Sequence, residues 1–189
     1  MLDVAGRYLR RFGVRAAVRR RGTCTKLEAF AYVPKNEWTV VVWPGYFNVA
    51  DIRLAAFLAK ELNTTVVTSH EYDEDYWTLA IFRRSARVDQ FASWPTYFSN
   101  SRRLVRAWSG HPQRVARVIG VPASVVAPYL VARARGKAFP DDRFQRDNYW
   151  VFTDLWRRLG IVYPERPNRY VRVLRVGSDF LDKLPSSQL

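Results

Sequence analysis

Three strand-like segments follow one another in the middle of the chain and constrain the fold more than any other feature. They are expected at residues 64–72, 76–82 and 87–92, with short polar connections between them. In the middle segment both alternating sets of side chains are largely apolar: Trp77, Leu79 and Ile81 on one side, Thr78, Ala80 and Phe82 on the other. A strand of this kind is covered on both of its faces. The sequence therefore predicts a sheet packed inside the molecule.

Hydrophobic periodicity assigns most of the remaining chain to further strands and to helices. Strands are expected at 26–33 and 38–43, joined by the polar turn 34–37, and a late strand is expected at 170–176. The expected helices are 51–62, 101–108, 112–119, 123–134 and 148–159. We therefore predict an α+β fold with an antiparallel sheet of about five strands, one inserted helix and a helical C-terminal half.

The N-terminal residues 2–21 predict a basic amphipathic helix that ends at Gly22. Its expected apolar face is formed by Leu2, Ala5, Tyr8, Leu9, Phe12 and Ala16. Arginines spaced four residues apart lie on the opposite side. The predicted organisation is this basic helix at 1–22, a sheet region at 23–98 and a helical region at 99–189 packed on it, together forming one globular unit.

Charge is distributed in blocks along the chain, whose formal net charge is +14. Residues 1–26 carry +7, residues 27–80 carry −5, residues 81–118 carry +7 and residues 119–189 carry +5. Arginine outnumbers lysine by 26 to 5. Codon usage is one explanation of that ratio. The other is that the guanidinium group binds phosphate and carboxylate partners through two parallel hydrogen bonds.

Several function classes are excluded by counts alone. No two of the nine glycines lie closer than seven residues apart, so neither a dinucleotide-binding loop nor a Walker loop is present. The single cysteine, Cys24, allows no intrachain disulfide and no CxxC site, which fits a reducing cytoplasm. The two histidines, His70 and His111, cannot build a three-histidine zinc site. No transmembrane segment and no cofactor are expected.

An acidic stretch after the first of the three central strands is the candidate catalytic or metal site. Glu71, Asp73 and Asp75 alternate, so in an extended chain they share one side. Neighbouring carboxylates repel one another unless a cation is bound, and oxygen ligands suit Mg²⁺ or Mn²⁺. His70 beside them is a candidate general base. The alternative interpretation is a solvated acidic connection between two strands.

Two arginine-rich segments are the candidate partner-binding residues. The first comprises Arg7, Arg11, Arg15, Arg19, Arg20 and Arg21. The second comprises Arg102, Arg103 and Arg106, which follow the aromatic stretch 94–98. Aromatic rings beside arginines can stack on bases and contact phosphates in single-stranded nucleic acid. The alternative is that these rings fill the core while the arginine head groups reach solvent.

Residues 113–130 resemble the helix-turn-helix pattern. Ala116 matches the small inward position and Gly120 the turn, and the apolar positions are Val115, Ile119, Val121, Val126 and Tyr129. The outward positions of the second helix are Pro122, Ala123, Ser124, Ala127 and Pro128. None of these is an Arg, Asn or Gln that reads base edges. The sequence therefore favours a packed helix pair without base readout.

A second resemblance covers most of residues 65–160. Its residues are Glu71-Tyr72-Asp73 with Asp75 and Trp77, then Val88-Asp89-Gln90-Phe91, then Trp94-Pro95-Thr96-Tyr97-Phe98. This order is similar to a pattern in a family of uncharacterised bacterial proteins, and the segments 137–142 and 150–154 are similar as well. No activity is attached to that family, so the resemblance implies no function.

We expect a cytoplasmic, non-catalytic binding protein that engages an acidic partner, either nucleic acid or an acidic protein surface, through its arginine-rich faces. Peripheral contact with anionic lipid through residues 2–21 is a further expectation for a basic amphipathic helix. The alternative function is a metal-dependent hydrolase that uses the acidic cluster 71–75.

Overall fold

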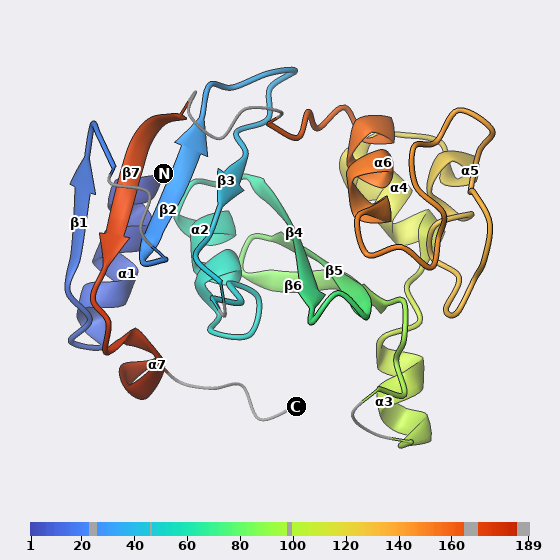
Figure 1. Cartoon of the computed structure of the whole chain (residues 1–189), viewed down its shortest axis with the longest axis horizontal. Coiled ribbons are helices and arrows are strands. Elements are labelled where there is room, and N and C mark those ends of the chain that lie inside the picture. The colour runs from blue at the N-terminus through green and yellow to red at the C-terminus, as the bar shows by residue number, and fades with distance from the viewer. Residues whose placement is uncertain (23–25, 46, 98–99, 165–169, 185–189) are drawn as a thin grey trace.

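Two antiparallel sheets form the framework of the fold, the four-stranded one at one side of the molecule and the three-stranded one nearer its middle, with helices packed between and beside them (Figure 1). The computed structural model describes residues 1–22, 26–45, 47–97, 100–164 and 170–184. The four-stranded sheet has the order β1-β7-β2-β3, with β1 (Ala16–Arg19), β7 (Tyr170–Val176), β2 (Glu28–Tyr32) and β3 (Val41–Val42). The three-stranded sheet has the order β4-β5-β6, with β4 (Thr65–Tyr72), β5 (Tyr76–Arg83) and β6 (Ala86–Ala92).

The helices are short and occur in both halves of the chain. They are α1 (Leu2–Arg11), α2 (Leu54–Glu61), α3 (Arg102–Ala107), α4 (Pro112–Ile119), α5 (Ala123–Val126), α6 (Val151–Arg158) and α7 (Phe180–Lys183). The longest of these described helices has ten residues, and none has the length and apolar character needed to cross a bilayer.

The predicted single sheet of about five strands, followed by a helical half, is wrong. The fold is α+β, but its strands form two sheets, and β7 near the C-terminus lies between β1 and β2. Arg175 pairs with Ala17 of β1 and with Glu28 of β2. Periodicity identifies a strand but not its neighbours, because pairing between distant segments depends on the packed tertiary structure.

The predicted helix over 2–21 is also wrong beyond its first half. Helix α1 ends at Arg11, and Gly13 follows in the left-handed conformation at φ 72°, which stops the helix. Residues 16–19 then form β1 and pair with β7. The segment 1–22 is therefore not a separate helical unit, since its second half belongs to the four-stranded sheet.

Strand β5 lies between two hydrophobic cores. Ala80 and Phe82 belong to a core shared with α1 and α2. Trp77, Leu79 and Ile81 belong to a second core shared with α4, α5 and α6. The prediction that the middle strand is covered on both faces is confirmed.

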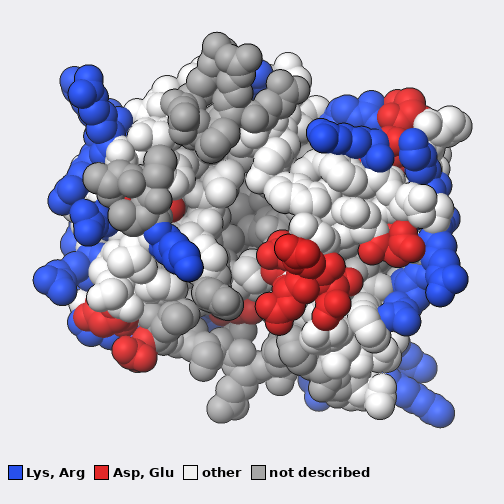
Figure 2. All heavy atoms as spheres, in the orientation of Figure 1, with Lys and Arg blue, Asp and Glu red and all other residues white. Residues whose placement is uncertain are grey.

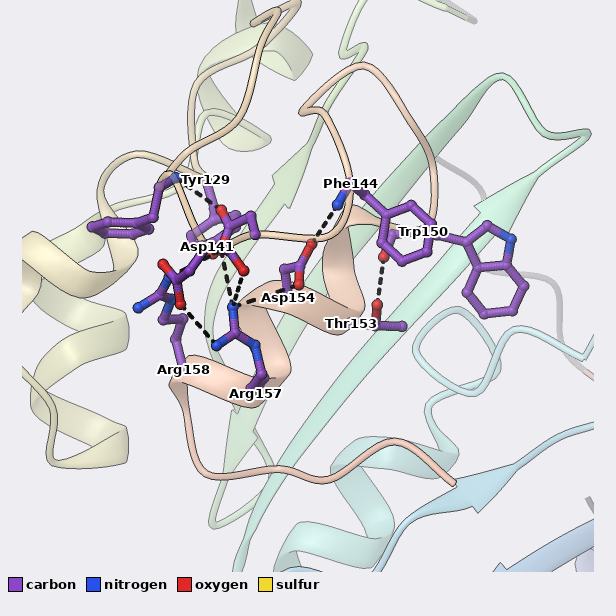
Figure 3. A network of polar contacts seen from close by, with 10 residues as sticks. Tyr129, Asp141, Phe144, Trp150, Thr153, Asp154, Arg157 and Arg158 are labelled. Atoms are coloured by element: carbon purple, nitrogen blue, oxygen red, sulfur yellow. Dashed lines mark hydrogen bonds and ion pairs between the residues drawn. The ribbon is translucent and has the colours of Figure 1, made fainter. Parts of the chain in front are cut away.

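A buried polar network holds the connection between α5 and α6 (Figure 3). The Asp142 side chain is fully buried and accepts hydrogen bonds from the Tyr129 hydroxyl at 2.7 Å and the Phe139 backbone N–H at 2.9 Å. Nη2 of Arg157 and Nη2 of Arg158 reach the same carboxylate at 3.3 and 3.1 Å. The network stabilises an irregular stretch of chain that has little regular hydrogen bonding of its own.

Asp154 extends the network from the first turn of α6. Its carboxylate is buried and accepts a hydrogen bond from the Phe144 backbone N–H at 2.8 Å. One guanidinium nitrogen of Arg157 lies 3.7 Å from the other oxygen. Asp154 thereby fixes the backbone of Phe144, in the irregular connection, to α6.

Candidate anion-binding groove

An open groove of about 730 Å³ lies where the end of α1 meets β1 and β7. Four arginine side chains line it: Arg10, Arg15, Arg19 and Arg175. All four residues are exposed to solvent. Among the described residues that line the groove there is no Asp or Glu. The groove therefore concentrates positive charge without a carboxylate of its own lining.

The strand register explains why three of these arginines face the same way. Arg15, Ala17 and Arg19 are every second residue along the β1 segment and so share one face, and Ala17 lies opposite Arg175. The pairing continues before β1, because the Gly177 N–H donates to the Arg15 carbonyl at 2.8 Å. Ala17, which has a small side chain, therefore lies between the three arginines in the register.

Arg10 reaches the groove from the last turn of α1. Its Nη1 donates to the Ala16 carbonyl at 2.8 Å, which holds the guanidinium beside the edge of β1. Asp179 follows the groove residue Ser178, and its Oδ2 lies 2.6 Å from Nζ of Lys183. The hydrogen bond from Lys183 lowers the pKa of Asp179, with a smaller contribution from the charge of Arg15. That carboxylate is already paired within the chain.

The sequence interpretation included Arg15 and Arg19 but missed Arg10 and Arg175. Arg10 belongs to the same basic segment, so its charge was visible although its position was not. Arg175 lies 156 residues after Arg19. Only the pairing of β1 with β7 brings them together. No local signal in the sequence reveals that pairing.

The other N-terminal arginines lie outside the groove lining. One guanidinium nitrogen of Arg7 lies 3.7 Å from Glu61, and the Arg11 guanidinium lies 4.7 Å from the centre of the Phe57 ring. Both therefore contact α2. Arg20 and Arg21 are exposed after β1.

The second arginine segment lies apart from the groove. Arg102, Arg103 and Arg106 are exposed on α3, a helix with no buried residue. In Figure 1 α3 lies at the opposite side of the molecule from α1 and β1. The two basic segments do not converge on one face, and Figure 2 shows an acidic patch between basic regions.

The expected contact of the 2–21 helix with lipid does not fit the structure. The apolar face of α1 is buried in the first core, and residues 16–19 are a strand. An interfacial helix needs a free apolar face to enter the headgroup region. The structure leaves α1 no such face.

The acidic stretch forms the tip of the β4–β5 hairpin rather than a row along one strand. Asp73 and Glu74 both have positive φ, which turns the chain between the strands. The Tyr97 hydroxyl donates to Asp75 at 2.8 Å, and the Glu74 N–H donates to Glu71 at 3.0 Å. The four acidic residues are exposed. The stretch is therefore not extended through Asp73 and Glu74, and it forms the solvated acidic connection between two strands that the sequence left as the alternative. Within the described part of the chain no three His, Cys, Asp or Glu residues gather to hold a metal ion.

His70 is partly buried on β4 and packs edge-on against Tyr72, with ring centres 4.5 Å apart. Burial lowers the pKa of His70 from its ordinary value of 6.5, because desolvation disfavours the charged imidazolium. A base with a lowered pKa is neutral at pH 7. No metal-binding cluster among the described residues accompanies it.

The pKa of His70 predicts an acid-sensitive contribution to stability. Protonation favours the unfolded chain, so this contribution is unchanged above about pH 6.5 and becomes destabilising as the pH falls toward the lower folded-state pKa. We expect His70→Gln to reduce the loss of stability between about pH 7 and pH 5. Urea unfolding of wild type and His70→Gln at several pH values measures the effect. An equal pH slope in wild type and His70→Gln would contradict the assignment.

The helix-turn-helix-like residues form a packed pair. Val115, Val126 and Tyr129 are buried in the second core, and Gly120 turns the chain at φ 86°. The second helix, α5, ends at Val126 after a single turn, much shorter than the predicted 123–134. Pro128 explains part of this difference, because it has no N–H to continue the helix.

Several residues of the bacterial resemblance pattern have structural roles. Asp89 is buried and accepts hydrogen bonds from the backbone N–H of His111 at 2.7 Å and from its Nδ1 at 2.9 Å, which joins β6 to the start of α4. Asp142 and Asp154 hold the α5–α6 connection.

Cys24 lies outside the described residues. No protein-family model, no curated protein and no solved structure matches the chain.

Proposed function

We propose that the protein is a non-catalytic binding protein that engages an acidic macromolecule through the arginine groove. The observation that supports this most is the meeting of Arg10, Arg15, Arg19 and Arg175 from three elements in one open groove. Guanidinium groups bind phosphate and carboxylate through paired, charge-assisted hydrogen bonds. A cytoplasmic location belongs to the proposal, because the single cysteine suits a reducing compartment.

The competing explanation of the same charges is that they protect the edge of the sheet from pairing with strands of other molecules. β1 is the outer strand of its sheet, and charged side chains on an outer strand discourage pairing with other molecules. Edge protection needs charge but no partner. Binding needs the arginines to contact an anion. A binding experiment therefore separates the two explanations.

The proposal predicts a salt-dependent affinity that the double variant Arg15→Ala/Arg175→Ala weakens. The probes are a fluorescent single-stranded oligonucleotide, a DNA duplex and a poly-glutamate peptide, measured by anisotropy from about 50 to 200 mM salt. For the nucleic acids, the slope of log Kd against log salt should fall by about two, one for each phosphate that the variant no longer neutralises. The control is Arg114→Ala/Arg117→Ala, which removes the same charge from exposed positions on α4.

The outcomes separate the partner classes and the competing explanation. Tighter binding of the oligonucleotide or duplex identifies a phosphate backbone, and tighter binding of poly-glutamate identifies an acidic protein surface. If the groove variant and the α4 control weaken binding equally, the affinity depends on net charge alone and not on the groove. That result, or the absence of binding to all three probes, would refute the proposal.

A further inference from the structure

A second cavity, of about 330 Å³, opens between the two sheets. Residues 39–41 line one wall, which is Val41 of the outer strand β3 with the two residues before it, and residues 64–69 of the outer strand β4 and its approach line the other. Ala55 and Leu58 of α2 lie against the same cavity. Figure 2 shows a hollow at this place, bordered by the acidic patch.

The two strands present unpaired edges to this cleft. Among the residues that the structure describes, β3 pairs only with β2, and β4 pairs only with β5. In the described chain no backbone hydrogen bond joins residues 39–42 to residues 64–69. An unpaired edge offers a row of N–H and C=O groups to another strand. Neighbouring strands are about 4.8 Å apart, so a strand that pairs with both edges spans a gap of about twice that distance.

We propose that this cleft takes an extended segment of a partner polypeptide, which pairs with β3 on one side and β4 on the other. The added strand would join the two sheets into one, in the order β1-β7-β2-β3-segment-β4-β5-β6. Main-chain hydrogen bonds supply affinity in this mode, and pockets for alternate side chains supply specificity. The site is separate from the arginine groove and does not depend on it.

The cleft also indicates the composition of the segment. Trp38, Trp43 and Trp156 line it, which favours apolar side chains at the centre of the segment. Trp156 is fixed in place because its Nε1 donates to the Ser69 hydroxyl at 2.9 Å. Glu37 is also in the lining, and β4 continues from Ser69 into the acidic hairpin. We therefore expect an apolar centre with a Lys or Arg beside it.

The experiment selects binders from a library of random 12-residue displayed peptides on the full chain. Enriched peptides are made synthetically, and their binding is measured by tryptophan fluorescence. Each central amide is then N-methylated in turn, which removes one donor and leaves the side chains unchanged. An inserted strand donates alternately to β3 and β4, so methylation at every central position should weaken binding, by up to about tenfold each.

Hydrogen exchange locates the contact in the same complexes. Amides of residues 39–42 and 65–69 should both gain protection, while binding to the Arg15→Ala/Arg175→Ala variant stays equal to wild type. Failure to enrich any peptide would overturn the proposal. So would insensitivity to N-methylation, sensitivity at alternate positions only, or protection of one strand alone, since each of these contradicts insertion between the two edges.

Discussion

Replacing Asp142 by asparagine should lower the free energy of unfolding by about 3–5 kcal/mol, the usual cost of removing one partner from a buried charge cluster. The side chain has no exposed surface and accepts hydrogen bonds from Tyr129, Phe139 and two arginines. An amide keeps the shape but directs an N–H₂ group at donors. The Tyr129 hydroxyl or the Phe139 N–H is then left without an acceptor inside the protein.

The neighbouring residue Asp141 provides a matched control. Its side chain is 59% exposed, although it contacts both Arg157 and Arg158. We expect Asp141→Asn to cost at most about 1 kcal/mol, because solvent screens exposed ion pairs. Urea unfolding followed by tryptophan fluorescence measures both variants. Similar losses for the two aspartates would show that burial of Asp142 does not decide the energetics of the network.

Trp77→Ala is the second substitution with a large expected effect, a loss of about 3–5 kcal/mol. Trp77 is the largest fully buried side chain among the described residues, at 1% exposure, and packs 5.2 Å from the Phe91 ring. Its removal leaves a cavity in the second core, beside β5, which the surrounding strands cannot fill. Circular dichroism at increasing urea concentration measures the change without relying on the removed fluorophore.

Two further substitutions bracket this result. Trp77→Phe keeps an aromatic ring and removes an indole N–H that has no hydrogen-bond partner, so we expect a loss below about 1.5 kcal/mol. Val171→Ala on β7, where Val171 is 48% exposed, should change stability by no more than about 0.5 kcal/mol. A Trp77→Ala loss as small as that of Val171→Ala would mean that the second core is not organised around β5.

Local signals in the sequence are sufficient to predict a helix or strand whose bounds are set by its own residues. Helix α4 occupies the predicted 112–119, because Pro112 suits the first turn and Gly120 adopts the left-handed conformation after the last. The late strand at 170–176 was predicted with the observed bounds, because its side chains alternate. Polar turns located the hairpins of the three-stranded sheet.

Features that depend on distant pairing were not predictable in this way. The four residues of β1 have no strong strand signal, and only β7 makes them a strand. The sequence left two interpretations of the acidic cluster open, and the turn decides between them, because Asp73 and Glu74 leave the extended conformation that a shared side requires. Asp tolerates positive φ, so its presence in a polar connection was the available signal for a turn.

The position of β7 also has a consequence for synthesis of the chain. β1 and β2 have no hydrogen bonds to each other in the sheet order, because β7 lies between them. β1 and β2 therefore cannot join one sheet until residues 170–176 have left the ribosome and can pair with both. At usual rates the intervening residues take on the order of 10–30 s to be made. During that time the nascent chain exposes two strands without their partner, which is the period when a chaperone has most to protect.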